Sequence, residues 1–197
     1  FTYYVDQVDE CFCPFNSPPD YHFTVETVIN HTEGVLAGQT TYRVHLNGVS
    51  PLDYLSACGG DGLDPLILQS TSGSWYNSPY NGSWNASGVN PAFFSFIPEL
   101  AFDSYVTIGA GDNLQEPQIH PSLVDYNGEL ANEFDEDGPG QNLTHDGVGI
   151  TWFSIFPGIE NSSYSAFFGE DLRVLVAQFT TAGEVYGQVN VQVFQNG

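Results

Sequence analysis

The chain has 197 residues, of which 41% are hydrophobic and 15% aromatic, enough to bury the core of one ordinary domain and too many for intrinsic disorder. Its 24 acidic residues face only Arg43 and Arg173, without any lysine, and the net charge is −22. This charge excludes nucleic-acid partners, which need cations against phosphate, and no apolar run reaches the roughly 20 residues of a membrane span.

Residues 1–20 are expected to form an irregular N-terminal arm, because Pro14, Pro18 and Pro19 would interrupt a strand ladder. An apolar extension must be covered by something. The arm is expected either to add a strand to its own domain or to lie along the edge of a neighbouring copy. Its large apolar side chains are those of Phe1, Tyr3, Tyr4, Val5, Val8, Phe12 and Phe15.

The rest of the chain has the pattern of β-strands separated by loops rich in Gly, Asn, Asp and Pro. In the last strand, residues with odd numbers from Val185 to Val193 form one face, which is typical of a half-buried antiparallel strand. The segment TTAGEVY (180–186) predicts a hairpin between the last two strands. The expected strands are 21–30, 40–46, 65–70, 101–109, 148–156, 172–181 and 184–194.

Only residues 90–100 favour a helix. Asn90 can cap it, Pro91 can occupy its first position, and Pro98 limits it to about two turns. Residues 110–147 form a long connection, which is typical of a functional loop or of short elements that the pattern hides. We therefore expect an all-β fold, a single antiparallel, jelly-roll-like β-sandwich over residues 21–197, with the arm in front of it and one short helix.

Several segments resemble a family of secreted domains from planctomycetes, other aquatic bacteria and algae. They are TYRV (41–44), NPAFF (90–94), FDSYVTIG (102–109), RVLVAQFT (173–180) and GQVNVQ (187–192). FDSYVTIG is the most specific of them. The resemblance implies an extracellular β-sandwich and transfers no established enzymatic activity. The chain departs from the family pattern in its cysteines and in its number of glycosylation sequons.

The chain has three cysteines, Cys11, Cys13 and Cys58, so at least one thiol has no partner within the molecule. A single residue between the first two is too little spacing for a zinc half-site. A bridge from either of them to Cys58 would close a loop of about 45 residues and contribute about 4 kcal/mol. The remaining thiol is expected to be free or to pair with another copy.

Five segments fit the N-glycosylation pattern N-x-[ST]. Together with the cysteines, they indicate an oxidising compartment and a glycoprotein that is secreted or displayed on the cell surface. The five asparagines are Asn30, Asn81, Asn85, Asn142 and Asn161.

No catalytic constellation is apparent, and we expect the protein not to be an enzyme and to require no cofactor. Carboxylates are too numerous for any pair to be informative, the five histidines are dispersed, and no G-x-S-x-G is present. Neighbouring residues such as His145 and Asp146 point apart. Asp103 lies between aromatic residues, and we expect it to cap backbone amides, a structural role.

Calcium is a candidate ligand, because several glycine-rich turns carry carboxylates, the hard oxygen ligands that calcium prefers. Solvated turns are the alternative interpretation, since none of them has EF-hand spacing. The candidate residues are Asp61, Asp64, Asp112, Asp135 and Asp137.

Carbohydrate is a second candidate ligand. Trp75 and Trp84 lie in an aromatic loop-rich segment and could offer flat surfaces for stacking of sugar rings. Packing of the same side chains against the sandwich is the simpler interpretation, and glycans on Asn81 and Asn85 would crowd such a surface.

These features predict a non-enzymatic extracellular structural glycoprotein, the subunit of a homopolymeric filament or surface layer linked through its arm. In this hypothesis, Cys11 or Cys13 fastens the arm, in one version to Cys58 of a neighbour. The alternative is a calcium-dependent carbohydrate-binding module.

Overall fold

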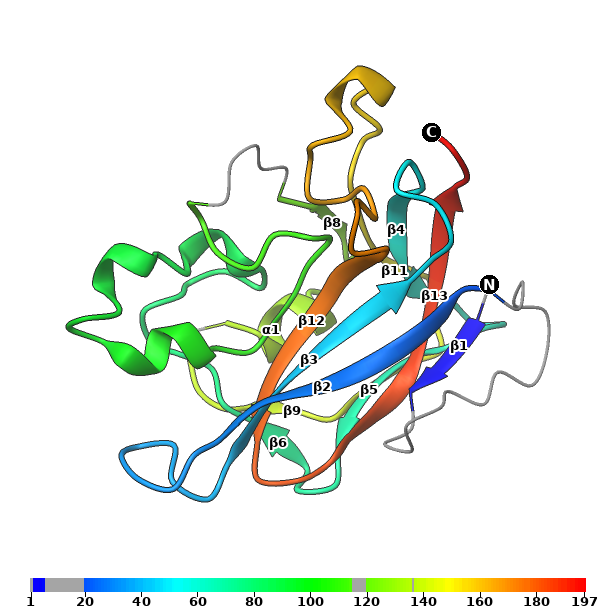
Figure 1. Ribbon diagram of the computed structural model, residues 1–197. Coiled ribbons are helices and arrows are strands. Elements are labelled where there is room, and N and C mark those ends of the chain that lie inside the picture. The colour runs from blue at the N-terminus through cyan, green and yellow to red at the C-terminus, as the bar shows by residue number, and fades with distance from the viewer. Residues whose placement is uncertain (1, 6–19, 115–119, 136) are drawn as a thin grey trace.

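The computed structural model describes residues 2–5, 20–114, 120–135 and 137–197, which form two antiparallel sheets with a shared core (Figure 1). The predicted all-β sandwich is confirmed. The larger sheet contains β1 (Thr2–Val5), β4 (Tyr54–Gly60), β5 (Leu66–Ser70), β8 (Ser122–Val124), β10 (Leu143–His145), β11 (Ile150–Phe153) and β13 (Val185–Phe194). The smaller contains β2 (His22–Asn30), β3 (Thr40–Asn47), β7 (Tyr105–Val106) and β12 (Arg173–Thr181), and β6 (Ser74–Trp75) pairs separately with β9 (Gly140–Gln141).

Strand β13 organises the larger sheet. β4 pairs with Asn190–Phe194, and β5 pairs with Val185–Gln188. These two strands therefore follow one another along one side of β13, and the loop 61–65 connects them. On the side away from β13, β11 pairs with β4 and β10 pairs with β5. β1 pairs with Gly187–Asn190. On one side of β13, these residues already pair with β5 or β4, or lie between residues that do. β1 therefore occupies the opposite side of β13.

The smaller sheet has the order β2-β3-β12-β7. Alternation along β3 directs Val44 and Leu46 into the core between the sheets. Arg43 and His45 belong to the other face of the same strand, which turns away from the core. This outer face carries the site described below.

The predicted hairpin between the last two strands is wrong. β12 pairs with β3 and β7 in the smaller sheet, whereas β13 pairs with β1, β4 and β5 in the larger one. Residues 182–184 therefore cross from one sheet to the other. A short glycine-bearing turn fits either connection, because period-two alternation fixes which face of a strand is buried and does not fix its neighbour.

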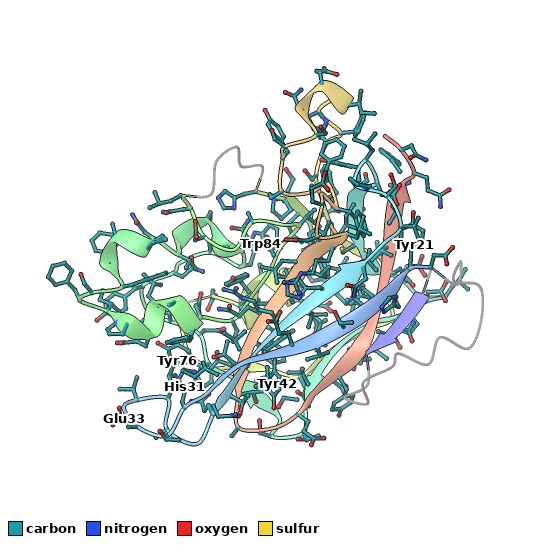
Figure 2. All side chains as sticks on the ribbon, in the orientation of Figure 1. Tyr21, His31, Glu33, Tyr42, Tyr76 and Trp84 are labelled. Carbon is teal, nitrogen blue, oxygen red and sulfur yellow. The ribbon has the colours of Figure 1, made fainter. Side chains whose placement is uncertain are left out.

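Large apolar side chains fill the space between the sheets (Figure 2). Trp152 and Tyr54 are fully buried, and the polar atom of each is hydrogen-bonded. Nε1 of Trp152 donates to the carbonyl of Thr107, and Oη of Tyr54 donates to Oγ of Ser154. Trp75 stacks on Phe134 with ring centroids 5.1 Å apart. The core thus extends from the two sheets under the long connection 110–147.

The helix expected at 90–100 is wrong in type. Asn90 caps as predicted, accepting from the amide of Ala92, but the segment forms separate 3-10 turns, η2 (Pro91–Phe93) and η3 (Pro98–Phe102). In the described part of the chain, the α-helix is α1 (Glu129–Glu133), within the long connection. Asp125 fixes its start by accepting from three amides, those of Glu129, Leu130 and Ala131. The other 3-10 turns are η1 (Ala86–Gly88) and η4 (Ile159–Asn161).

Candidate functional site

The arm contributes strand β1 to the chain's own larger sheet. β1 pairs with Gly187–Asn190 of β13, and we call this side of the segment the β13 edge. Thr2 lies opposite Asn190 and Tyr4 opposite Gln188 in an antiparallel register. β1 also contacts β2, so it bridges the edge strands of the two sheets (Figure 1). For the arm residues Tyr3, Tyr4 and Val5, the structure therefore has the first of the two expected arrangements, a strand added to the same domain.

The predicted bridge to Cys58 is contradicted. Cys58 is an unpaired thiol in the middle of β4, between Val191 of β13 and Trp152 of β11, and only 1% of it is exposed. Burial raises the pKa of this thiol far above its ordinary value. The thiol of Cys58 is enclosed by the core and forms no bridge in the structure. The partner cysteines Cys11 and Cys13 lie outside the described residues, as do Phe1, Val8, Phe12 and Phe15.

Two of the five sequon asparagines are buried in the fold. Asn81 and Asn85 are 1% and 5% exposed, and each side chain is hydrogen-bonded inside the 78–87 loop. A glycan on Asn81 cannot coexist with this packing. Asn161 donates its amide to the carbonyl of Pro157 and is half-buried. Asn30 and Asn142 are exposed, although Oδ1 of Asn142 accepts from the amide of Ser70 and its Nδ2 donates to the carbonyl of Ser70. Glycosylation of both asparagines stays a prediction.

The acidic turns form local hydrogen bonds. Oδ1 of Asp61 accepts from the amides of Leu63 and Asp64, and Oδ1 of Asp112 accepts from that of Leu114. Asp135 caps the amide of Asp137 in the same way. Within the described residues, no three His, Cys, Asp or Glu side chains converge as a metal site would require. Calcium binding stays a prediction without a defined site.

The predicted stacking surface is not formed by its tryptophans. Trp75 is 1% exposed, and its Nε1 donates to the carbonyl of Glu133 at 2.9 Å. Trp84, labelled in Figure 2, is half-buried and packs against the core. For both tryptophans the structure therefore has the simpler of the two arrangements, packing against the sandwich.

The outer face of the smaller sheet holds a cleft of about 570 Å³, the arginine cleft, that the sequence did not reveal as a site. Its floor is Arg43 and His45 of β3 with Arg173 and Leu175 of β12. Its walls are the loops 109–112 and 162–171. Gly109 lets the loops touch: its φ is +83°, and a Cβ there would lie 1.9 Å from the carbonyl oxygen of Ser165.

Arg43 is held in place by a buried amide. Its Nε donates to Oε1 of Gln178 at 2.9 Å. Gln178 is 1% exposed, and its Nε2 donates to the carbonyls of Ala101 and Asp103. The amide of Gln178 cannot rotate without losing these bonds, so the guanidinium of Arg43 has a fixed orientation in the cleft.

His45 is neutral at pH 7 in this setting. Burial, assisted by the charge of Arg173, lowers its pKa to about 4, although Glu26 acts in the opposite direction. Nδ1 of His45 lies 3.9 Å from Oε2 of Glu26, too far for a hydrogen bond. A neutral imidazole can either donate or accept, which suits a polar ligand without demanding a particular charge.

The sequence contained a signal for this cleft. Arg43 and His45 are two apart on a predicted strand and must share a face, and Arg173 begins another predicted strand. What the sequence lacked was the pairing of β3 with β12, which joins residues more than a hundred positions apart.

No helix in the described part of the chain has the length and apolar character to cross a membrane. Comparison with known protein families, with curated proteins and with solved structures finds no significant match to this chain.

Proposed function

We propose that the protein is a non-enzymatic, extracellular structural subunit that assembles with copies of itself by exchanging strand β1 at the β13 edge. The observation that supports this most is the antiparallel pairing of Thr2–Val5 with Gly187–Asn190. The strand reaches the sheet through backbone hydrogen bonds, and an identical strand from another copy would form the same bonds.

The connection between β1 and β2 makes exchange feasible. Residues 6–21 join these strands, and a chain of this length can span up to roughly 50 Å. A closed monomer and an exchanged assembly then have the same strand pairing. Loop-closure entropy favours the monomer, whereas a high protein concentration favours exchange. Head-to-tail exchange that does not close on itself produces a filament.

The charge of the chain sets a condition on assembly. Copies with a net charge of −22 repel one another at low ionic strength. Backbone pairing of β1 needs no charged side chain, so salt should screen the repulsion without weakening the contact. Assembly is therefore expected to increase with ionic strength.

A cysteine pair across the register tests the proposal. In a Cys11→Ser, Cys13→Ser background, Thr2→Cys and Asn190→Cys place thiols at positions that face each other in the pairing. After incubation at high protein concentration and oxidation, we expect a ladder of covalent oligomers on a non-reducing gel, which reduction collapses to the monomer.

The matched control replaces Asn190→Cys with Gln192→Cys, two residues further along β13 and outside the paired range. It should give no ladder, because the thiols are then too far apart to bridge without backbone movement. If the Thr2–Asn190 pair closes only within single molecules at every concentration and salt, strand exchange is refuted.

A further inference from the structure

The arginine cleft contains every lysine or arginine side chain of the protein. Both arginines line it, in a protein with 24 acidic residues. Random placement would surround each arginine with carboxylates, since these outnumber arginines twelvefold. The two arginines differ in whether a carboxylate lies beside them.

Arg173 has a counter-charge and Arg43 does not. Nη1 of Arg173 lies 3.4 Å from Oε2 of Glu26, and both side chains are substantially exposed. Arg43 is half-buried and forms no ion pair with any described residue; its Nε is bonded to the neutral amide of Gln178, and its side chain also interacts with the neutral hydroxyl of Tyr105. A partly desolvated guanidinium without a carboxylate is unfavourable in the free protein, and a bound anion would offset that cost.

Two other cleft residues carry polar atoms without a partner. Nδ1 of His45 and Oγ of Ser165 are both buried and make no hydrogen bond within the described part of the chain. His45 as a whole is 8% exposed. Both residues line the same cleft as Arg43. Buried polar groups are normally satisfied, and a ligand with hydroxyl groups beside its charged group could satisfy the imidazole of His45 and Oγ of Ser165 once the side chains that cover them shift.

The lining also limits the charge of the ligand. Asp112, Glu170 and Asp171 contribute carboxylates to the cleft walls, which would repel a multiply charged anion such as phosphate. A single carboxylate matches the one arginine without a counter-charge, and the planar fork of a guanidinium binds carboxylate in a bidentate manner. A volume of about 570 Å³ lies in the range of small-molecule sites.

We propose that the arginine cleft binds an acidic monosaccharide, with its carboxylate on Arg43 and its hydroxyl groups on His45 and Ser165. The site is separate from the β13 edge and does not depend on assembly. It is also separate from the aromatic loop of Trp75 and Trp84.

Titration with sodium glucuronate, followed by the ring proton resonances of His45 and by calorimetry, tests the assignment. We expect saturable binding that shifts the His45 resonances. Glucose, which has the ring without the charge, and acetate, which has the charge without the ring, should each bind at least about tenfold more weakly, as should phosphate. Arg43→Gln should lower glucuronate affinity at least about tenfold.

His22→Gln, at an exposed position of β2 outside the cleft, is the control and should change the affinity less than about threefold. Ser165→Ala, which leaves the charge untouched, should weaken glucuronate and leave acetate unchanged, so the test holds even if Arg43→Gln does not fold. The assignment is overturned by absence of saturable binding, by acetate or glucose binding as tightly as glucuronate, or by an acidic peptide binding more tightly than the sugar.

Discussion

Nδ2 of Asn81 donates a hydrogen bond to Oδ2 of Asp103 at 2.7 Å, and both residues are 1% exposed. The same amide nitrogen donates to the carbonyl of Asn85, and Oδ1 of Asp103 accepts from the amide of Ser78. The pair fastens the 78–85 loop to the end of η3. An asparagine in a sequon is thus part of the core, and the structural role that the sequence predicted for Asp103 agrees with these bonds.

Asn81→Ala is expected to lower the free energy of unfolding by about 1–3 kcal/mol, because the buried carboxyl of Asp103 loses a hydrogen-bond donor. Asn30→Ala removes an exposed sequon asparagine and should stay within about 0.5 kcal/mol of the wild type. Urea unfolding measures both. Peptide mass spectrometry of protein from a eukaryotic host should find Asn81 unmodified; a glycan there in folded protein would contradict the packing.

Asp103 should also give stability a pH dependence. Burial raises the pKa of its carboxyl from 3.8 to about 7, although bonds from Ser78, Asn81 and Ser104 lower it. Between about pH 4 and 7, the folded protein holds a proton that the unfolded chain has lost. The contribution of Asp103 to the free energy of unfolding therefore falls as pH rises through this window, by at most about 1.4 kcal/mol per pH unit, whereas His45, whose pKa burial lowers to about 4, contributes with the opposite sign.

Asp103→Asn removes this titrating group and should make the slope of the free energy of unfolding against pH more positive than that of the wild type between pH 4 and 7, whatever its effect on absolute stability. Asp146→Asn, at an exposed position, should leave the wild-type slope unchanged. Chemical denaturation at several pH values measures the slopes. Equal slopes for Asp103→Asn and wild type would show that another group carries the pH dependence.

The sequence predicted the strands whose residues alternate clearly, and it missed those that do not. β2, β3, β12 and β13 were all expected near their observed bounds. β4, YLSACGG, was missed although it is central, because both its faces are covered and it ends in glycines. Gly59 is needed there, since a Cβ would lie 2.1 Å from the carbonyl oxygen of Ile150.

Sites were harder to predict than strands, because each depends on contacts between distant residues. Trp75 looked like a candidate for sugar stacking until Phe134 was placed against it. The sequence makes Cys58 a candidate bridge partner, but in the structure it lies between β11 and β13. The arginine cleft needs β3 beside β12 and two loops above them. The family resemblance and the extracellular location stay predictions.

The burial of Cys58 predicts that its thiol is inert. In the Cys11→Ser, Cys13→Ser protein, a thiol reagent such as dithionitrobenzoate should find no reactive group in the folded state and one after denaturation. The raised pKa of the thiol and the enclosing sheets act in the same direction. Rapid labelling of the folded protein would mean that β4 is accessible. Cys58→Ala should lower the free energy of unfolding by about 1–2 kcal/mol.

His145 should stabilise the fold most while it is protonated. Its Nδ1 lies 2.7 Å from Oε2 of Glu129, and its Nε2 faces the carbonyl of Val148, so both ring nitrogens must donate to satisfy both acceptors. Burial lowers the pKa of His145, but these bonds outweigh it, and the net shift is upward from 6.5. The imidazolium joins α1 to the strand β10.

Because the folded pKa is raised, the contribution of His145 is complete below about pH 6.5 and is lost as pH rises through the folded pKa. His145→Gln can satisfy at most one of the acceptors as a donor and should lose stability at pH 6 but little at pH 9, so that its melting temperature varies less across this range than that of the wild type. His22→Gln, on the exposed end of β2, should keep the wild-type difference. If His145→Gln loses the same stability at both pH values, the residue acts through packing and its charge contributes nothing.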